Sequence, residues 1–291
     1  MKVIGFTFVR NAVEYDYPIV EAIQSILPLC NEVIVSIGNS KDNTEGLVRS
    51  IQSPKLKIHH STWDDSLREG GRVLAAETDK AFDFVPADAD WCLYIQADEV
   101  IHEKYYAVVK EAMEKYRDNL NVEGLLFKYI HFFASYDFVG DSRKWYGHEI
   151  RVIRNDRSIR SYRDAQGFRK AGRKLFVKPI DAWIYHYGWV RHPLAQLQKL
   201  NNFVKFWNAT DQPPATIPKT ADSFFDYSRI DSLAHFTGTH PQVMQERIRN
   251  KNWTFDYDIT KKKFSLKGRL LRWVERITGK RLFEYKNYKI I

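Results

Sequence analysis

The strongest constraint on the fold is the alternation of short β-rich runs with helical patterns over the first half of the chain. The β-rich runs are "VIGFTF", "EVIVSI", "LKIHH" and "WCLYI", and segments such as "PIVEAIQSILPLC" between them carry apolar residues at helical spacing. Successive strands joined through helices are parallel, because each crossover returns the chain to the same end of the sheet. The sequence therefore predicts an α/β, doubly wound domain with a mostly parallel sheet.

The second half of the chain has a different pattern. Short β-runs, "EIRVIR" and "AWIYHY", lie among Arg, Trp and Tyr residues, and a helical pattern follows them. The proline-rich stretch "ATDQPPATIPKT" (209–220) is the best candidate for a boundary or a mobile loop. We expect a domain over residues 1–210, with a nucleotide-binding half at about 1–120 and a smaller acceptor half at about 121–210. A helical C-terminal extension then covers 211–291.

The net charge of +9 belongs to the C-terminal end of the chain. Residues 261–291 hold eleven Lys or Arg against two Glu, so the preceding residues are neutral by count. In "FSLKGRLLRWVERITGKR" apolar residues recur at helical spacing among basic ones, which predicts a basic amphipathic helix that ends at Gly279. Such a helix either packs its apolar stripe on the domain or binds an anionic membrane surface. No nucleic-acid-binding motif accompanies it, so we expect no nucleic-acid partner.

The cysteines and the N-terminus predict a cellular compartment. Cys30 and Cys92 lie among apolar residues, which is typical of buried thiols in a reducing compartment rather than of a disulfide framework. The N-terminal apolar run is too short for a secretory signal, and no stretch approaches the length of a membrane span. We therefore expect a cytoplasmic protein whose membrane contact, if it has one, is peripheral and at the inner face of the cell membrane.

Polar clusters follow three of the predicted strands, at residues 7–11, 38–44 and 96–99. In an open α/β sheet, ligands bind outside the carboxyl ends of the strands, so a single site can collect all three clusters. A carboxylate beside a bound diphosphate suits Mg²⁺ or Mn²⁺, which prefer oxygen ligands. Two of these clusters also have a simpler explanation. Asp98 and Glu99 could cap the helix that follows them, and "GNSKDNT" could be only a capped turn.

The order of these segments resembles the family 2 nucleotide-sugar glycosyltransferases of the GT-A fold. The resemblance rests on "FTFVRNAVEYDYPIVEAIQSILP", on "EVIVSIGNSKDNTEGLV", which is similar to the family's strand and Ser-x-Asp-x-Thr turn, and on "WCLYIQADEV", which is similar to its metal-binding Asp-x-Asp segment. It covers roughly the first hundred residues and, more loosely, the region to about residue 190. It implies a nucleotide-binding sheet, a divalent metal ion (Mn²⁺ or Mg²⁺) on the donor diphosphate, and transfer of a sugar to a hydroxyl acceptor with inversion.

The resemblance also implies roles for matching residues. Asp98 is the expected metal ligand, with His186 as a second contact to the metal or the phosphates. The catalytic base that takes the acceptor proton is Asp164, which follows "EIRVIR", in preference to Glu149. The implied donor-binding residues are Thr7, Val9, Arg10, Asn11, Gly38, Asp42, Gln96, Ala97 and Arg191.

The sequence departs from the family pattern in two places. Gln96 replaces the first Asp of the metal segment, so we expect the substitution Gln96→Asp to be tolerated. Ile37 and Gly38 replace the acidic pair that usually precedes the turn, which leaves the nucleotide base open.

The expected function is therefore glycosyl transfer in cell-envelope polysaccharide or lipopolysaccharide synthesis, onto a glycan or lipid-linked acceptor. One alternative is a nucleotidyltransferase, although "FVRNAVEY" lacks the glycine-rich loop that would hold a triphosphate. The other alternative is a non-catalytic, glycosyltransferase-like binding protein.

Overall fold

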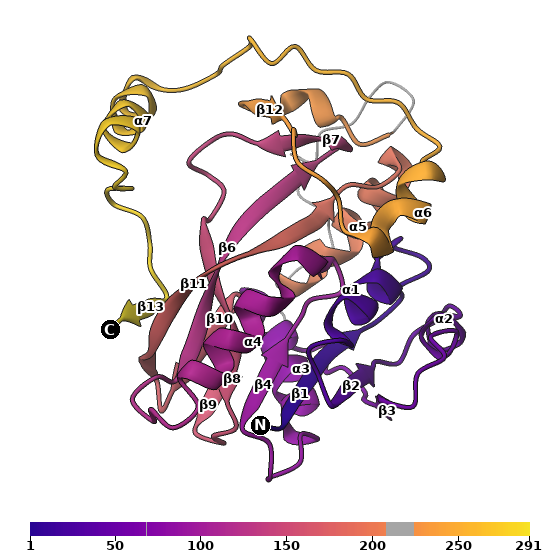
Figure 1. Cartoon of the computed structure of the whole chain (residues 1–291). Helices are drawn as coiled ribbons and strands as arrows, with labels where there is room; N and C mark the ends of the chain where they lie inside the picture. Colours follow the sequence, from indigo (N-terminus) through magenta and orange to yellow (C-terminus); the bar gives the residue numbers. More distant parts are fainter. Residues whose placement is uncertain (68, 208–223) are drawn as a thin grey trace.

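The computed structural model describes residues 1–67, 69–207 and 224–291. In its first half, strands and helices alternate as the sequence predicts (Figure 1). The elements are β1 (Val3–Val9), α1 (Ile19–Ile26), β2 (Glu32–Ile37), α2 (Thr44–Arg49), β3 (Leu56–His60), α3 (Arg72–Asp83) and β4 (Trp91–Tyr94). The four strands pair in parallel in the order β3-β2-β1-β4. The predicted α/β class is confirmed.

The second half extends the same sheet with mixed strand directions. Its elements are β5 (Glu99–Ile101), a 3₁₀ helix (Glu103–Tyr105), α4 (Tyr106–Lys115), β6 (Gly124–Phe133), β7 (Ser135–Gly140), β8 (His148–Arg154), β9 (Ile159–Tyr162), β10 (Gly167–Lys170), β11 (Arg173–Trp189), α5 (Pro193–Phe203), β12 (Leu233–His235), α6 (Gln245–Arg249), α7 (Leu266–Thr278) and β13 (Tyr288–Ile290). Beyond β4 the order continues β8-β6-β11-β10-β9. The long strands β6 and β11 pair in parallel, and β5 adds to β11 antiparallel.

Helices cover both faces of the sheet, as a doubly wound fold requires. Successive residues of a strand point to opposite faces. In β1, Val3 and Val9 face a core shared with α1 and α4, whereas Ile4 and Phe6 face a core shared with α3. The alternation places Thr7 on the first of these faces, fully buried. Apolar burial on both sides therefore fixes the register of β1. The carboxyl end of β1 then lies at the edge of the sheet where ligands bind in open α/β folds.

The C-terminal residues join the same sheet. β12 pairs with β7, and β13 pairs in parallel with β11. The predicted basic helix is present as α7 and ends at Gly279 in the left-handed conformation, with φ of 65°. The proline-rich stretch and the predicted boundary after residue 210 lie outside the described residues, so the domain division stays a prediction. None of the described helices combines the length and apolar character needed to cross a membrane.

The two cysteines agree with their prediction. Cys30 and Cys92 are both buried and free, on opposite faces of the sheet. Burial raises the pKa of the Cys30 thiol to about 12, so it is uncharged at neutral pH.

Candidate active site

A cavity of about 760 Å³ opens where β1, β4 and β11 end and α5 begins. This is the carboxyl edge of the parallel strands, where the sequence predicts a site. It is lined by residues from distant parts of the chain, so the tertiary structure brings most of the predicted site together. The predicted residues that line it are Val9, Arg10, Asn11, Gln96, Ala97, Asp98, Asp164 and His186.

The loop after β1 is tied to the loop after β2. Asn11 has a φ of 55°, a left-handed conformation that asparagine tolerates better than most residues. Its backbone N–H donates to Ser40 Oγ (3.0 Å), and its side-chain oxygen accepts from the Lys41 N–H (2.9 Å). Two of the predicted polar clusters therefore act as one unit at the cavity rim.

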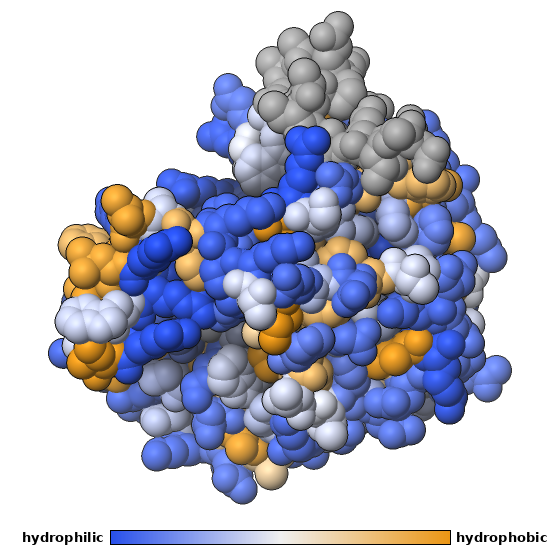
Figure 2. All heavy atoms as spheres, turned by 90° about the horizontal axis from the view of Figure 1, so that it is seen from above, coloured by the Kyte–Doolittle hydropathy of each residue, from blue (hydrophilic) through white to orange (hydrophobic). Residues whose placement is uncertain are grey.

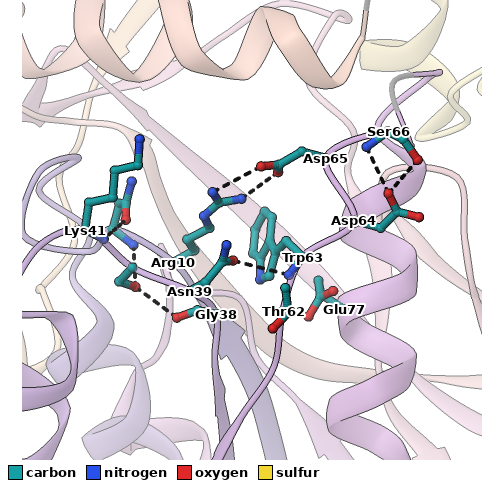
Figure 3. Close-up of polar contacts among 12 residues, drawn as sticks. Arg10, Gly38, Asn39, Lys41, Thr62, Trp63, Asp64, Asp65, Ser66 and Glu77 are labelled. Atoms are coloured by element: carbon teal, nitrogen blue, oxygen red, sulfur yellow. Dashed lines mark hydrogen bonds and ion pairs between the residues drawn. The ribbon is translucent and has the colours of Figure 1, made fainter.

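An aromatic platform lies beside this rim (Figure 3). The Arg10 guanidinium donates to both carboxylate oxygens of Asp65, at 2.7 and 3.3 Å, and lies 5.3 Å from the centre of the Trp63 ring. Trp63 itself packs between Phe8 and Phe206. Trp63 is only 8% exposed, so the ring and the Arg10 guanidinium contribute a rigid aromatic and cationic wall to the cavity. Sequence analysis missed Trp63, whose only signal is its place just after the run "LKIHH".

Gly38 leaves room for this platform. A Cβ atom at Gly38 would lie 2.7 Å from Trp63 Cδ1, closer than any real contact. Gly38 therefore lies directly behind Trp63, and Trp63 rather than Gly38 lines the cavity.

Three other predicted donor residues, Thr7, Asp42 and Arg191, are not among the described residues that line the cavity. Thr7 faces the α1 side of the sheet. Asp42 uses one oxygen to accept from the Thr44 N–H (3.0 Å) at the start of α2 and the other to accept from the Glu14 N–H (2.7 Å). Arg191 is fully buried and donates to the carbonyls of Tyr15 (2.6 Å) and Gly188 (3.1 Å). The hydrogen bonds of Asp42 are those of a capped turn, which is the alternative role predicted for "GNSKDNT". Direct contacts of Thr7, Asp42 and Arg191 with a donor stay predictions.

Asp98 is the centre of a buried cluster of charges. Its Oδ2 accepts from Lys199 Nζ (3.3 Å), and its Oδ1 lies 3.7 Å from His186 Nε2. Burial alone would raise the pKa of this carboxyl group, but the nearby Lys199, His186 and Arg191 side chains lower it to about 2. Asp98 is therefore a carboxylate at any physiological pH.

Glu99, the neighbouring carboxylate, has a different role. It is completely buried and accepts from Arg151 Nε (2.7 Å) and Nη2 (2.8 Å) and from the Tyr129 hydroxyl (2.8 Å). The 3₁₀ helix that follows is capped by His102, whose ring accepts from the Lys104 N–H. The alternative that Asp98 and Glu99 cap this helix is therefore wrong.

Lys199 is a site residue that the sequence analysis missed. It lies on the inner side of α5 and donates to the Gly188 carbonyl (3.1 Å) as well as to Asp98. Burial and the nearby charge of Arg191 lower its pKa to about 7. The sequence did offer a signal. Lys199 is spaced three residues from Gln196 and four from Phe203, which places the three on one face of a helix, and a lysine on a helix face that is buried is unusual.

The tautomer of His186 leaves one ring nitrogen open toward Asp98. Because the Tyr146 carbonyl can only accept, His131 Nε2 donates to it (2.8 Å). Burial lowers the pKa of His131 to about 3, so its ring is neutral and its Nδ1 must accept from His186 Nδ1 at 3.0 Å. Burial also lowers the pKa of His186, so its Nε2 carries a lone pair. The network thus leaves His186 Nε2 available to accept or to ligate, and its role as a metal contact stays a prediction.

The two donors fit a hard divalent cation. A Cβ atom at Gly188 would lie 2.5 Å from His186 Nε2 and 2.9 Å from Asp98 Oδ2, so this glycine keeps the space around the pair open. Within the described part of the chain, no group of three or more His, Cys, Asp or Glu side chains is arranged to hold a metal. A pair of protein ligands is typical of Mg²⁺ or Mn²⁺ sites that take their other ligands from phosphates and water.

Asp164 is presented to the cavity by a strained loop between β9 and β10. Its neighbours Arg163 and Ala165 have φ of 56° and 62°, a left-handed conformation that is uncommon for residues other than glycine. Such strain is found most often at functional sites. The Gln96 side-chain amide donates to the Ala165 carbonyl (3.2 Å), which ties this loop to the end of β4. Burial raises the pKa of Asp164.

Glu149, the second candidate base, lies behind the cavity wall. It is buried in β8, and its Oε2 has no hydrogen-bond partner among the described residues. Burial, together with the negative charges of Glu99 and Asp164, raises its pKa to about 8 despite the neighbouring Arg151. Glu149 is therefore largely neutral at pH 7, and the geometry favours Asp164 as the base.

Comparisons with known proteins found similarity only among solved structures. Neither a protein-family model nor a curated protein matches the sequence. Among solved structures, the chain is similar to S. aureus TarS 1-349 in complex with UDP (16% identity, covering 69% of this chain and 64% of that one, TM-score 0.38). It is also similar to glucosyl-3-phosphoglycerate synthase from Mycobacterium tuberculosis in complex with Mn²⁺, UDP and phosphoglyceric acid (17% identity, 45% and 43%, TM-score 0.30).

A third similar structure belongs to another class of enzyme. It is 4-diphosphocytidyl-2C-methyl-D-erythritol synthase from Anaerococcus prevotii (8% identity, covering 53% of this chain and 70% of that one, TM-score 0.30). The alignments span between 35% and 64% of the TarS chains, so this chain matches about a third to under two thirds of their length.

Proposed function

We propose that the chain is a metal-dependent glycosyltransferase that moves a sugar from a nucleotide-diphosphate donor to a hydroxyl acceptor with inversion. The observation that carries this proposal is the pairing of Asp98 with an oriented His186 Nε2 in the same cavity as Asp164. Two ligands for a hard cation and a separate carboxylate in one cavity match what such a transfer needs.

Each part of the cavity has a role in this proposal. Trp63 and Arg10 hold the nucleoside, while Asp98 and His186 hold a Mg²⁺ or Mn²⁺ ion. Such an ion, when bound, neutralises the charge that develops on the diphosphate as it leaves. Lys199, when protonated, adds a positive charge next to Asp98, where the phosphates would lie.

Asp164 takes the proton of the acceptor hydroxyl as that oxygen attacks the anomeric carbon of the sugar. Attack from the side opposite the leaving diphosphate inverts the configuration at that carbon. Gln96 holds the loop that carries this carboxylate in place. An acceptor belonging to a cell-envelope glycan stays a prediction from the sequence.

The test is release of nucleoside diphosphate from a panel of nucleotide sugars, with Mn²⁺, with Mg²⁺ and with a chelator. Asp164→Asn should lower turnover roughly a hundredfold with little change in the KM for the donor, since it removes the base and keeps the shape. Asp181→Asn, at an exposed position in β11, is the matched control and should turn over like the wild type.

Two results would contradict the proposal. Release of pyrophosphate from a nucleoside triphosphate, without turnover of any nucleotide sugar, would identify a nucleotidyltransferase. Nucleotide-sugar binding without turnover under any metal condition would identify a binding protein. If Glu149→Gln, rather than Asp164→Asn, abolished turnover, the base would be Glu149.

A further inference from the structure

Helix α7 presents its apolar side to solvent. Leu266, Leu270, Trp273 and Ile277 are between 60% and 84% exposed, and Phe283 in the following segment is 88% exposed. Figure 2 shows hydrophobic side chains gathered at the left margin of the molecule, the side on which Figure 1 shows α7, beside hydrophilic ones. None of the residues of α7 is buried and only Leu271 and Val274 among its apolar residues are half-buried, so most of the apolar stripe does not pack on the domain.

The helix is attached to the domain by charged side chains instead. Arg272 donates to both the backbone carbonyl and the carboxylate of Asp141, and Glu275 accepts from Arg143. Lys262, just before the helix, donates to the other Asp141 oxygen (2.8 Å). These ion pairs fix the rotation of α7 about its axis. The apolar stripe therefore points away from the domain because the opposite side of the helix is held.

Cations flank the stripe. Lys267, Arg269, Arg276 and Lys280 form no ion pair with any carboxylate that the structure describes, in contrast to Arg272. They belong to the segment that holds the whole net charge of the chain. An outward apolar stripe bordered by cations is the arrangement by which helices lie in the interface of an anionic bilayer.

We propose that α7 docks the protein on an anionic lipid surface, with Leu270, Trp273 and Ile277 entering the interface between headgroups and acyl chains. This goes beyond the proposed transfer reaction and does not depend on it. A second copy of the chain is disfavoured as occupant, because two segments of the same high positive charge would meet. Nucleic acid would neutralise the cations but leave the apolar stripe in water.

Vesicle cosedimentation tests this with the full-length protein. Wild type should pellet with vesicles of phosphatidylcholine and phosphatidylglycerol at low salt, be released at high salt, and stay in solution with phosphatidylcholine alone. The double substitution Leu270→Glu, Ile277→Glu should weaken the partition at least about tenfold, because each change removes an inserting apolar group and adds a negative charge. Leu120→Glu, at an apolar position 78% exposed elsewhere, is the matched control and should bind like wild type.

A further variant isolates the charges. Lys267→Gln, Arg269→Gln and Lys280→Gln together should weaken binding to the anionic vesicles about a hundredfold, because three cations attracted by the anionic surface are removed. Thermal unfolding should be unchanged in all variants, because the replaced side chains are exposed or unpaired. This measurement separates loss of binding from loss of fold.

Several results would overturn the proposal. Wild type that fails to pellet, a stripe variant that pellets as well as wild type, or equal binding to neutral vesicles would each do so. A concentration-dependent dimer in the absence of lipid that the stripe variant abolishes would identify a second copy as the occupant. Salt-sensitive binding to DNA or RNA that the stripe variant retains, without vesicle binding, would identify nucleic acid.

Discussion

Replacing Glu149 by Gln should make the protein more stable at alkaline pH. The folded protein holds the pKa of Glu149 at about 8, against an ordinary value of 4.5, chiefly because the side chain is buried. Between these two values the folded state retains a proton that the unfolded chain releases, so the stability of the wild type falls as the pH rises. At 1.36 kcal/mol for each pKa unit, the free energy of unfolding of the wild type falls by at most about 5 kcal/mol over this pH range. The Glu149→Gln variant would carry no such cost, since its side-chain amide stays neutral.

Urea denaturation of the wild type and Glu149→Gln at two pH values measures this effect. At about pH 5 the two proteins should differ by less than about 1 kcal/mol, and at about pH 9 the variant should be more stable by up to about 5 kcal/mol. Other groups titrate in both proteins, so the difference between them isolates Glu149. An equal difference at both pH values, or a variant that is less stable at about pH 9, would refute the assignment of Glu149 as a buried neutral acid.

Three further predictions concern the cluster around Asp98. Asp98→Asn should abolish metal-dependent turnover with the fold intact, because the amide keeps the volume but loses the charge that a divalent cation needs; near-normal turnover at saturating Mn²⁺ would contradict this. Gln96→Asp should lower kcat by about tenfold, since it removes the donor to the Ala165 carbonyl, and unchanged kcat would show that this contact is dispensable. Lys199→Met should weaken donor binding about tenfold or more, measured by nucleotide-sugar titration, and unchanged affinity would place the phosphates elsewhere.

The revised expectation for Gln96 shows where the sequence is insufficient. From the sequence, Gln96 is a missing carboxylate in a metal segment, and Gln96→Asp is expected to be tolerated. In the structure, its amide contacts Ala165, 69 residues further along the chain. A contact over such a separation depends on how β4 and the β9–β10 loop meet, and no local pattern encodes it.

The sequence by itself determined the parallel strands β1 to β4, both free cysteines, α7 and its end at Gly279. These follow from local rules: the spacing of apolar residues distinguishes strands from helices, and glycine favours a left-handed helix end. The polar cluster at Asp98 could also be placed, because the carboxyl ends of parallel strands meet at one edge of the sheet.

Only the tertiary structure decided which polar residues of each cluster reach the cavity and which support it. Asp98 faces the cavity while the adjacent Glu99 pairs with Arg151, because neighbouring residues at the end of a strand point to opposite sides. The tertiary structure also decided the orientation of α7. From the sequence, its apolar stripe could pack on the domain or face solvent. Its direction was settled by the ion pair of Arg272 with Asp141, two residues far apart in the chain that only folding brings together.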